Sequence, residues 1–138
     1  MNLTIDDIYD LFSWDASYSD EENNLREEQG IAEARKLKNI FPFIRPIVAG
    51  KNSKLVWEPC AKVVALKSDE ELCNYIFLLL EWLQDMNWPG AEIIFDRLSQ
   101  IPLAKIDSYI EFSMKLAKKD DDICWLNTLK ALKEHRDW

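Results

Sequence analysis

Two carboxylates, Glu81 and Asp85, stand four residues apart in the string LEWLQDMNWPGA, which occupies residues 80–91. This spacing is about one helical turn, so both side chains would lie on the same face of a helix. Two carboxylates in different surroundings can divide the work of a general acid and a general base, as hydrolases and some transferases require. The alternative is structural: the pair forms the solvated edge of a helix that is otherwise buried. The residues alone leave both interpretations open.

Other reactive side chains are few and scattered: His135, Cys60, Cys73 and Cys124. The single histidine lies near the end of the chain, and no nucleophile nearby nominates it as a general base. The histidine and the cysteines are too far apart in the sequence for a zinc cluster. The three glycines do not form a phosphate-binding loop. We therefore expect no catalytic residue, no cofactor and no metal, and we expect that the protein is not an enzyme.

The string around the carboxylates is typical of a sharp joint between two helices. Ser68 and Glu71 form a capping box that starts a helix over residues 69–85, which the apolar pattern predicts to be buried on two sides. Pro89 suits the first turn of the following helix. The polar residues of the joint can close or cap these helices: Asn87 by a left-handed conformation or as a cap, and Asp85 by accepting from open amides. The residues assigned to this structural motif are Trp82, Gln84, Asp85, Asn87, Trp88 and Pro89.

The sequence of the joint also supports a resemblance. Residues 82–89, WLQDMNWP, resemble the WLQDxNWP signature of a family of small, mostly bacterial proteins of unknown function. In that family a second motif of the form DDxWKYW follows downstream, and here residues 120–125, DDDICW, keep only its acids and one aromatic. The resemblance covers residues 68–135. It implies an α-helical, HEAT-like fold and a binding scaffold, and it carries no known activity.

Helices are predicted across nearly the whole chain, about seven in all, and no strand is predicted. They include a short helix capped by Thr4, a long helix over residues 19–40 that begins with a capping box of Ser19 and Glu22, a short one bracketed by Pro42 and Pro46 and ended by Gly50, and a last helix over residues 122–136. The acidic run at residues 120–122 is expected to cap this last helix. The apolar stripe of the last helix is expected to consist of these side chains: Ile123, Leu126, Leu129 and Leu132.

Three tryptophans form a weak internal repeat. Trp57, Trp88 and Trp125 each stand near the start of a predicted helix, at spacings of 31 and 37 residues. Periods in this range are typical of stacked helical pairs. The fold class is therefore predicted as all-α, an irregular HEAT-like stack of helical hairpins, with a helical bundle as the alternative. Residues 1–138 are expected to form a single domain, with acidic N-terminal helices over 1–50 and the hairpins over 51–138.

Composition limits the class of protein. With 48% hydrophobic residues, the chain can build a core and is not globally disordered. The longest apolar run is residues 75–80, which is too short to span a membrane. The N-terminus lacks the basic and then apolar order of a signal peptide, and the cysteines show no close spacing. A cytoplasmic location is expected.

The charge is concentrated at one end of the chain. Residues 1–30 contain nine acids and one base, Arg26, while the remainder carries sixteen of each. Such an edge repels nucleic acid and anionic membranes and attracts a basic protein surface, with aromatic anchors beside it. The candidate partner-binding residues are Trp14, Asp15, Tyr18, Asp20, Glu21, Glu22, Glu27 and Glu28. The alternative is that these acids form an ordinary solvated face and that the aromatics pack inward.

Together these observations favour a non-enzymatic, cytoplasmic protein-binding scaffold. A concrete version is an immunity protein that neutralises a basic toxin, such as a nuclease, through the acidic edge. The alternative is a small hydrolase or transferase that uses Glu81 and Asp85. The sequence does not fix the oligomeric state.

Overall fold

The structure is a computed structural model that describes residues 3–49 and 52–134. Within these residues the chain is all-helical, with eight α-helices, one short 3₁₀ helix and no strand. The helices are α1 (Ile5–Phe12), α2 (Asp20–Arg35), η1 (Phe41–Phe43), α3 (Lys54–Ala65), α4 (Asp69–Leu72), α5 (Ile76–Trp82), α6 (Ala91–Ser99), α7 (Leu103–Lys119) and α8 (Ile123–Glu134). The predicted all-α class is confirmed, with one α-helix more than the seven expected.

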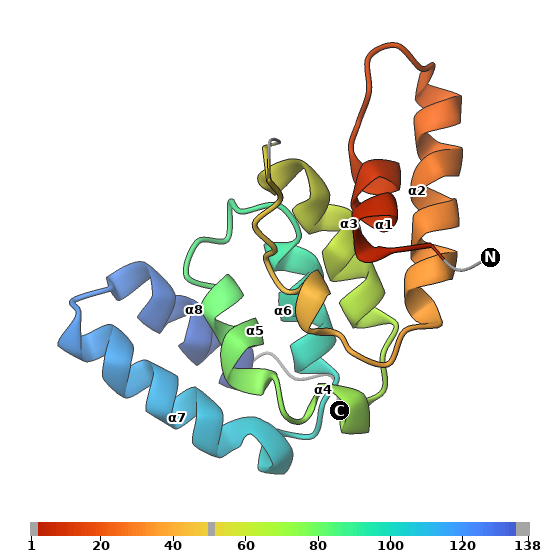
Figure 1. The fold of residues 1–138 in the computed structure, drawn as a ribbon. Helices are drawn as coiled ribbons and strands as arrows, with labels where there is room; N and C mark the ends of the chain where they lie inside the picture. Colours follow the sequence, from red (N-terminus) through yellow and green to blue (C-terminus); the bar gives the residue numbers. More distant parts are fainter. Residues whose placement is uncertain (1–2, 50–51, 135–138) are drawn as a thin grey trace.

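The helices are arranged as an irregular stack of hairpins (Figure 1). Helices α1 and α2 form one hairpin, and α7 and α8 form another at the opposite end of the molecule. Between them α3 packs against α1 and α2 on one side and against α6 on the other. Helix α5 packs on α7, and α6 on α8. The loop that joins α1 to α2 projects beyond the rest of the molecule.

The first two helices begin where the sequence predicts. Thr4 and Asp7 form a complete capping box at the start of α1. At the start of α2, the Ser19 hydroxyl accepts a hydrogen bond from the amide of Glu22. The capping box is incomplete, because the Glu22 carboxylate accepts from that hydroxyl and not from the Ser19 amide. Gly30 allows a close approach of the two helices, since a Cβ there would be 2.6 Å from the ring of Phe12.

Helix α2 ends at Arg35, earlier than the predicted limit of residue 40. Lys67, which is only 6% exposed, donates from Nζ to the carbonyl oxygens of Arg35 (3.2 Å) and Leu37 (2.6 Å). Arg35 is the last residue of the helix and Leu37 lies just beyond it, so neither carbonyl accepts from an amide within the helix, and the buried ammonium group satisfies both. The chain then turns so that Ile40 enters the core.

The predicted extent of the short helix between Pro42 and Pro46 is wrong. Only Phe41–Phe43 are helical, as a 3₁₀ turn with Pro42 inside it. Arg45 then adopts a left-handed conformation with φ of 42°, although the residue before a proline ordinarily favours an extended backbone. Gly50, the predicted end of that helix, lies outside the described residues.

The helix predicted over residues 69–85 is divided in two. Its capping box, Ser68 with Glu71, is present, but α4 ends at Leu72 and α5 begins at Ile76. The tight turn between them is closed by bonds from the amides of Cys73 and Tyr75 to carbonyls three residues earlier. Neither residue is a strong helix former, so little opposes the break. After it, α5 is buried as predicted.

The last helix starts as predicted, after Asp122, whose carboxylate accepts from the amide of Trp125 (3.0 Å). Its apolar stripe is partly wrong. Ile123 is 67% exposed, and Trp125 faces the core together with Leu129 and Leu132. Residues 135–138, which include His135, lie outside the described residues.

Candidate functional site

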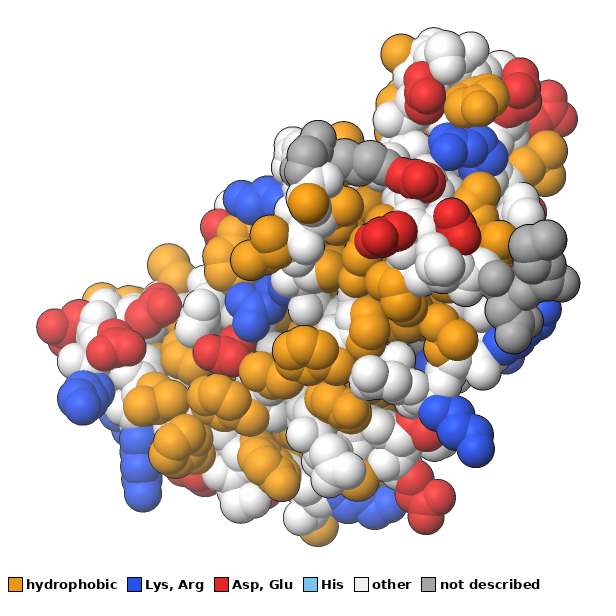
Figure 2. Space-filling view, viewed as in Figure 1, with side chains coloured by type: hydrophobic (Ala, Val, Ile, Leu, Met, Phe, Trp, Pro, Cys, Tyr) orange, Lys and Arg blue, Asp and Glu red, His pale blue; other side chains and the backbone are white. Residues whose placement is uncertain are grey.

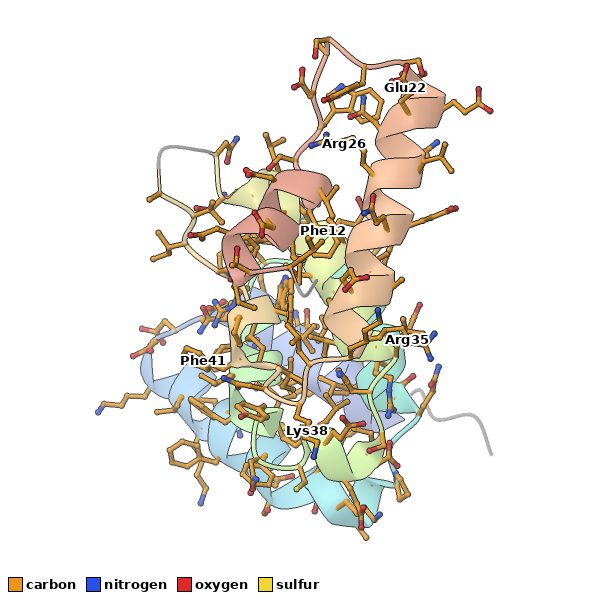
Figure 3. The ribbon with its side chains drawn as sticks, turned by 45° about the vertical axis from the view of Figure 1, so that its right-hand side comes forward. Phe12, Glu22, Arg26, Arg35, Lys38 and Phe41 are labelled. Carbon is orange, nitrogen blue, oxygen red and sulfur yellow. The ribbon has the colours of Figure 1, made fainter. Side chains whose placement is uncertain are left out.

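The most distinctive surface is the end of the α1–α2 hairpin, which we call the acidic tip. It consists of the loop over residues 13–19 and the exposed first half of α2, residues 20–28. Figure 3 shows Glu22 at the outer end of α2 and Arg26 one turn further in, directed toward the loop. In Figure 2 acidic side chains gather around this projecting end. The tip is therefore accessible from several sides.

The loop of the acidic tip is held by one buried side chain from α2. Asn23 is only 5% exposed. Its Oδ1 accepts from the amide of Asp15 (3.1 Å), and its Nδ2 donates to the carbonyls of Asp15 (2.9 Å) and Ser19 (3.2 Å). These bonds satisfy backbone groups that would otherwise need water. The loop thus has a defined conformation, and sequence reasoning missed the residue that sets it.

Arg26 holds the same loop from the next turn of α2. Its guanidinium donates to the carbonyl oxygens of Ser13 (3.2 Å) and Asp10 (2.8 Å). The guanidinium carbon also lies 4.7 Å from the ring centroid of Tyr18. This cation stacks on the aromatic ring and bonds to backbone at the same time. The single base among the first thirty residues therefore organises the acidic tip.

Seven of the eight predicted partner-binding residues are exposed together at the acidic tip. Trp14 is 52% and Tyr18 41% exposed, so the two aromatics do not pack inward. The exposed acids are Asp15, Asp20, Glu21, Glu22 and Glu28. Glu27 differs, because its carboxylate lies 3.3 Å from Nζ of Lys62 on α3 and ties the tip to the body.

Asp15 is the acid with the most defined role in the loop. Its carboxylate accepts from both the amide (2.9 Å) and the hydroxyl (2.7 Å) of Ser17. These two bonds, aided by Arg26, hold the pKa of Asp15 below its usual range. A lowered folded-state pKa means that the stabilisation is present at neutral pH and is lost as the pH falls through that pKa, below about 4.

Replacing Asp15 by asparagine is therefore expected to lower the melting temperature slightly at pH 7 and to have a smaller effect near pH 3. The comparison is made by thermal denaturation across that range. A ¹³C NMR titration of the carboxyl group supplies the control, since Ser17→Ala should raise the pKa of Asp15 toward its ordinary value. An equal effect of Asp15→Asn at both pH values would contradict the role given to the ionised carboxylate.

A groove opens between the acidic tip and the start of α3. Its volume is about 550 Å³. The walls are formed by Asp10, Ser13, Trp14, Asp15, Ala16, Arg26, Asn52 and Leu55. Leu55 is 49% exposed and supplies an apolar surface from α3. The sequence does not predict that α3 lies beside the acidic tip, because the two segments are far apart in the chain.

The helical joint at residues 82–90 is built from backbone bonds. Trp82 is fully buried and donates from Nε1 to the carbonyl of Pro89 (3.1 Å). Asp85 accepts from the amide of Asn87 (2.8 Å), as predicted for a residue that bonds to open amides. The left-handed residue is Gly90 (φ 85°) and not Asn87, and α6 starts at Ala91, so Pro89 lies ahead of its first turn.

Aromatic rings close the joint. Trp57 meets Trp82 and Trp88 edge to face, with centroids 6.2 Å and 5.7 Å apart. Trp125 donates its indole N–H to the carbonyl of Leu80 (3.0 Å). The three tryptophans of the internal repeat thus converge on the end of α5. Gln84 lies half-buried in the turn after α5.

The two carboxylates that could do chemistry both have structural partners. Oε1 of Glu81 lies 3.7 Å from the guanidinium of Arg45, which also lies 5.6 Å from the ring centroid of Trp88. Asp85 is engaged by the amide of Asn87. A shallow groove of about 280 Å³ lies beside the joint, and neither carboxylate is among its lining residues. The catalytic alternative stays a prediction without a supporting geometry.

The described part of the chain contains no cluster of metal ligands and no membrane-spanning helix. Over residues 3–49 and 52–134, no group of three or more His, Cys, Asp or Glu side chains is placed to hold a metal ion. No described helix is long and apolar enough to cross a bilayer. The three cysteines are unpaired; burial raises the pKa of the Cys60 thiol, while Cys73 and Cys124 are exposed.

The fold and the surface define a small all-helical protein, a stack of hairpins with a projecting acidic tip. The chain belongs to the family described as a domain of unknown function, DUF5071, which matches residues 58–136. The match contains the helical joint and falls within the C-terminal part of the chain, whereas the acidic tip precedes it. Searches of curated proteins and of solved structures found no significant match.

Proposed function

We propose that the protein is a non-enzymatic, cytoplasmic protein-binding scaffold that engages a basic partner through the acidic tip. The observation that carries this proposal is the exposure of Trp14 (52%) and Tyr18 (41%) on a projecting loop that two side chains of α2 hold in place. Exposed aromatic side chains on an ordered loop lose little conformational freedom when a partner covers them. Such residues commonly supply much of the energy of an interface.

The negative charge of the acidic tip favours a partner with a basic surface. The first thirty residues contain nine acids and one base, and that base is engaged by backbone carbonyls and Tyr18. A negative, projecting surface accelerates encounter with a cationic protein and disfavours nucleic acid and anionic lipid. The concrete version is an immunity protein that covers a basic toxin such as a nuclease. It is favoured because a toxin of that kind presents the complementary charge.

The proposal is tested by affinity capture from the source cells. One bait is the unaltered protein, and a second carries lysine at four exposed acids of the tip: Asp20, Glu21, Glu22 and Glu28. A matched control bait carries the same change of charge at four exposed acids elsewhere: Glu58, Glu70, Glu92 and Asp96. Circular dichroism establishes that all three baits are folded.

We expect the unaltered and control baits to retain a basic protein. The tip variant should capture at least about tenfold less of it, because several charge contacts are lost. Equal capture by all three baits at low salt would show that the acidic tip is not the binding surface. For the immunity version, the captured protein should be a toxin whose activity falls on addition of the unaltered protein but not of the tip variant.

We infer a different role for residues 82–89. These residues form the joint that positions α5 and α6, and their side chains bond to backbone groups within it. We propose that they are the signature of the DUF5071 family because the fold of residues 58–136 depends on this turn. Partner choice is then set by the surface that precedes the family domain.

A further inference from the structure

Among the described tryptophans, Trp14 alone has neither an aromatic or cation contact nor a hydrogen bond from its indole N–H. Trp57, Trp82 and Trp88 form a cluster, and Trp125 is buried with its indole N–H bonded to a carbonyl. Among the described residues, neither a ring nor a cation contacts the ring of Trp14, and its indole N–H has no acceptor. The ring is 52% exposed and lines the groove of about 550 Å³.

The loop that forms one wall of the groove is held in a defined conformation. On one side the loop is fixed by Asn23 and Arg26; on the other, Leu55 projects from α3. The ion pair between Glu27 and Lys62 links α2 to α3, the helix that carries Leu55. An occupant would meet an indole ring and a leucine side chain flanked by the carboxyl-bearing residues Asp10 and Asp15.

We propose that this groove binds an arginine side chain of the partner protein. The inference rests on the proposed function and specifies what the acidic tip recognises. An arginine places its aliphatic stem against Leu55 and its planar guanidinium on the face of Trp14, while the guanidinium N–H groups donate to Asp15. A lysine ammonium also pairs with a carboxylate, but it lacks the planar surface that stacks on indole.

Among the described residues that line the groove, the one cation is Arg26, and it does not cancel this preference. Arg26 directs its guanidinium to the carbonyls of Ser13 and Asp10 and to the ring of Tyr18. It thereby leaves the ring of Trp14 open. The described lining also includes the acidic residue Asp15, whose charge favours a cationic occupant. The interaction already present between Arg26 and Tyr18 is the arrangement that a partner arginine would repeat on Trp14.

The test is a titration that does not need the natural partner. A capped glycine-rich pentapeptide with one central arginine is added to the ¹⁵N-labelled full-length protein at physiological salt. Matched peptides carry lysine, or citrulline, which keeps the shape of arginine without its charge. Trp14 is followed through its indole N–H signal, assigned by its loss in Trp14→Phe. We expect saturable shifts at Trp14, Arg26, Asn52 and Leu55, and binding of the citrulline peptide at least about tenfold weaker, because charge-assisted bonds are lost.

Variants separate the groove from the general charge of the tip. Trp14→Ala should weaken arginine binding by about tenfold, and Leu55→Ser by about threefold. The lysine variant of the four acids on α2 should change the binding by less than about threefold, because salt screens distant charges. Equal affinity for the three peptides, or no effect of Trp14→Ala, would overturn the inference. If the peptide test fails but affinity capture still depends on the acidic tip, the proposed function stands without the groove. If affinity capture does not depend on the tip, the proposed function itself is wrong.

Discussion

Replacing Trp82 by alanine is expected to lower the free energy of unfolding by about 4 kcal/mol, the usual loss for a large aromatic in a core. Trp82 is fully buried, donates to the carbonyl of Pro89 (3.1 Å) and meets the ring of Trp57 edge to face. Alanine removes these contacts and leaves a cavity at the joint between α5 and α6. For a domain of this size the melting temperature should fall by roughly 10 °C or more, measured by circular dichroism.

Two further variants identify the cause of that loss. Trp82→Phe keeps most of the ring and removes the indole N–H, so it should cost about half as much. Trp14→Ala makes the same truncation at a half-exposed site and should change the stability by less than about 0.5 kcal/mol. Similar losses for Trp82→Ala and Trp14→Ala would contradict the central position of Trp82.

The starts of helices were predictable because they depend on neighbouring residues. Thr4, Ser19 and Ser68 each cap a helix at the predicted place. A capping residue bonds to an amide two or three positions ahead, so the signal is contained in a few residues of sequence. The same locality explains why Asp122 was identified as the cap of the last helix.

The ends of helices were less predictable because distant residues decide them. Helix α2 stops where Lys67, thirty-two residues from Arg35, donates to the carbonyl of that last residue. The break between α4 and α5 has no proline or glycine to announce it. Apolar periodicity continues through both positions, so a rule based on periodicity extends the helix. Packing against other elements overrides it.

The candidate site was predicted in part. Trp14, Tyr18 and the acids were selected from charge and from the scarcity of apolar residues in the first half of α2, and those features are local. Asn23 and Arg26 were not given their roles, since their bonds reach residues 8 to 16 positions away. An asparagine inside a helix is a usable signal, because it is a weak helix former that bonds readily to nearby backbone. The groove with α3 depends on long-range packing and had no local signal.

Replacing Gly90 by alanine is expected to destabilise the protein by about 3 kcal/mol. Gly90 has a φ of 85°, a conformation that costs an L-residue about 1–2 kcal/mol. A Cβ at this position would also lie 2.7 Å from the Cβ of Ala61 and 3.0 Å from the carbonyl oxygen of Trp57 on α3. Overpacking of this kind typically costs a further 1–3 kcal/mol or so. Chemical denaturation of both proteins measures the difference.

The two contributions at Gly90 can be separated, because they respond to different changes. Gly90→Asn keeps the added Cβ but suits the left-handed conformation, so it should recover only the backbone part, about 1 kcal/mol. Ala61→Gly removes the atom that the new Cβ would meet at 2.7 Å. In a double-mutant cycle, Gly90→Ala should therefore cost less in the Ala61→Gly background, by about 1 kcal/mol. Exact additivity would mean that the Cβ of Ala61 does not constrain residue 90, and would leave the loss to backbone strain and to the contacts with Trp57 and Trp82.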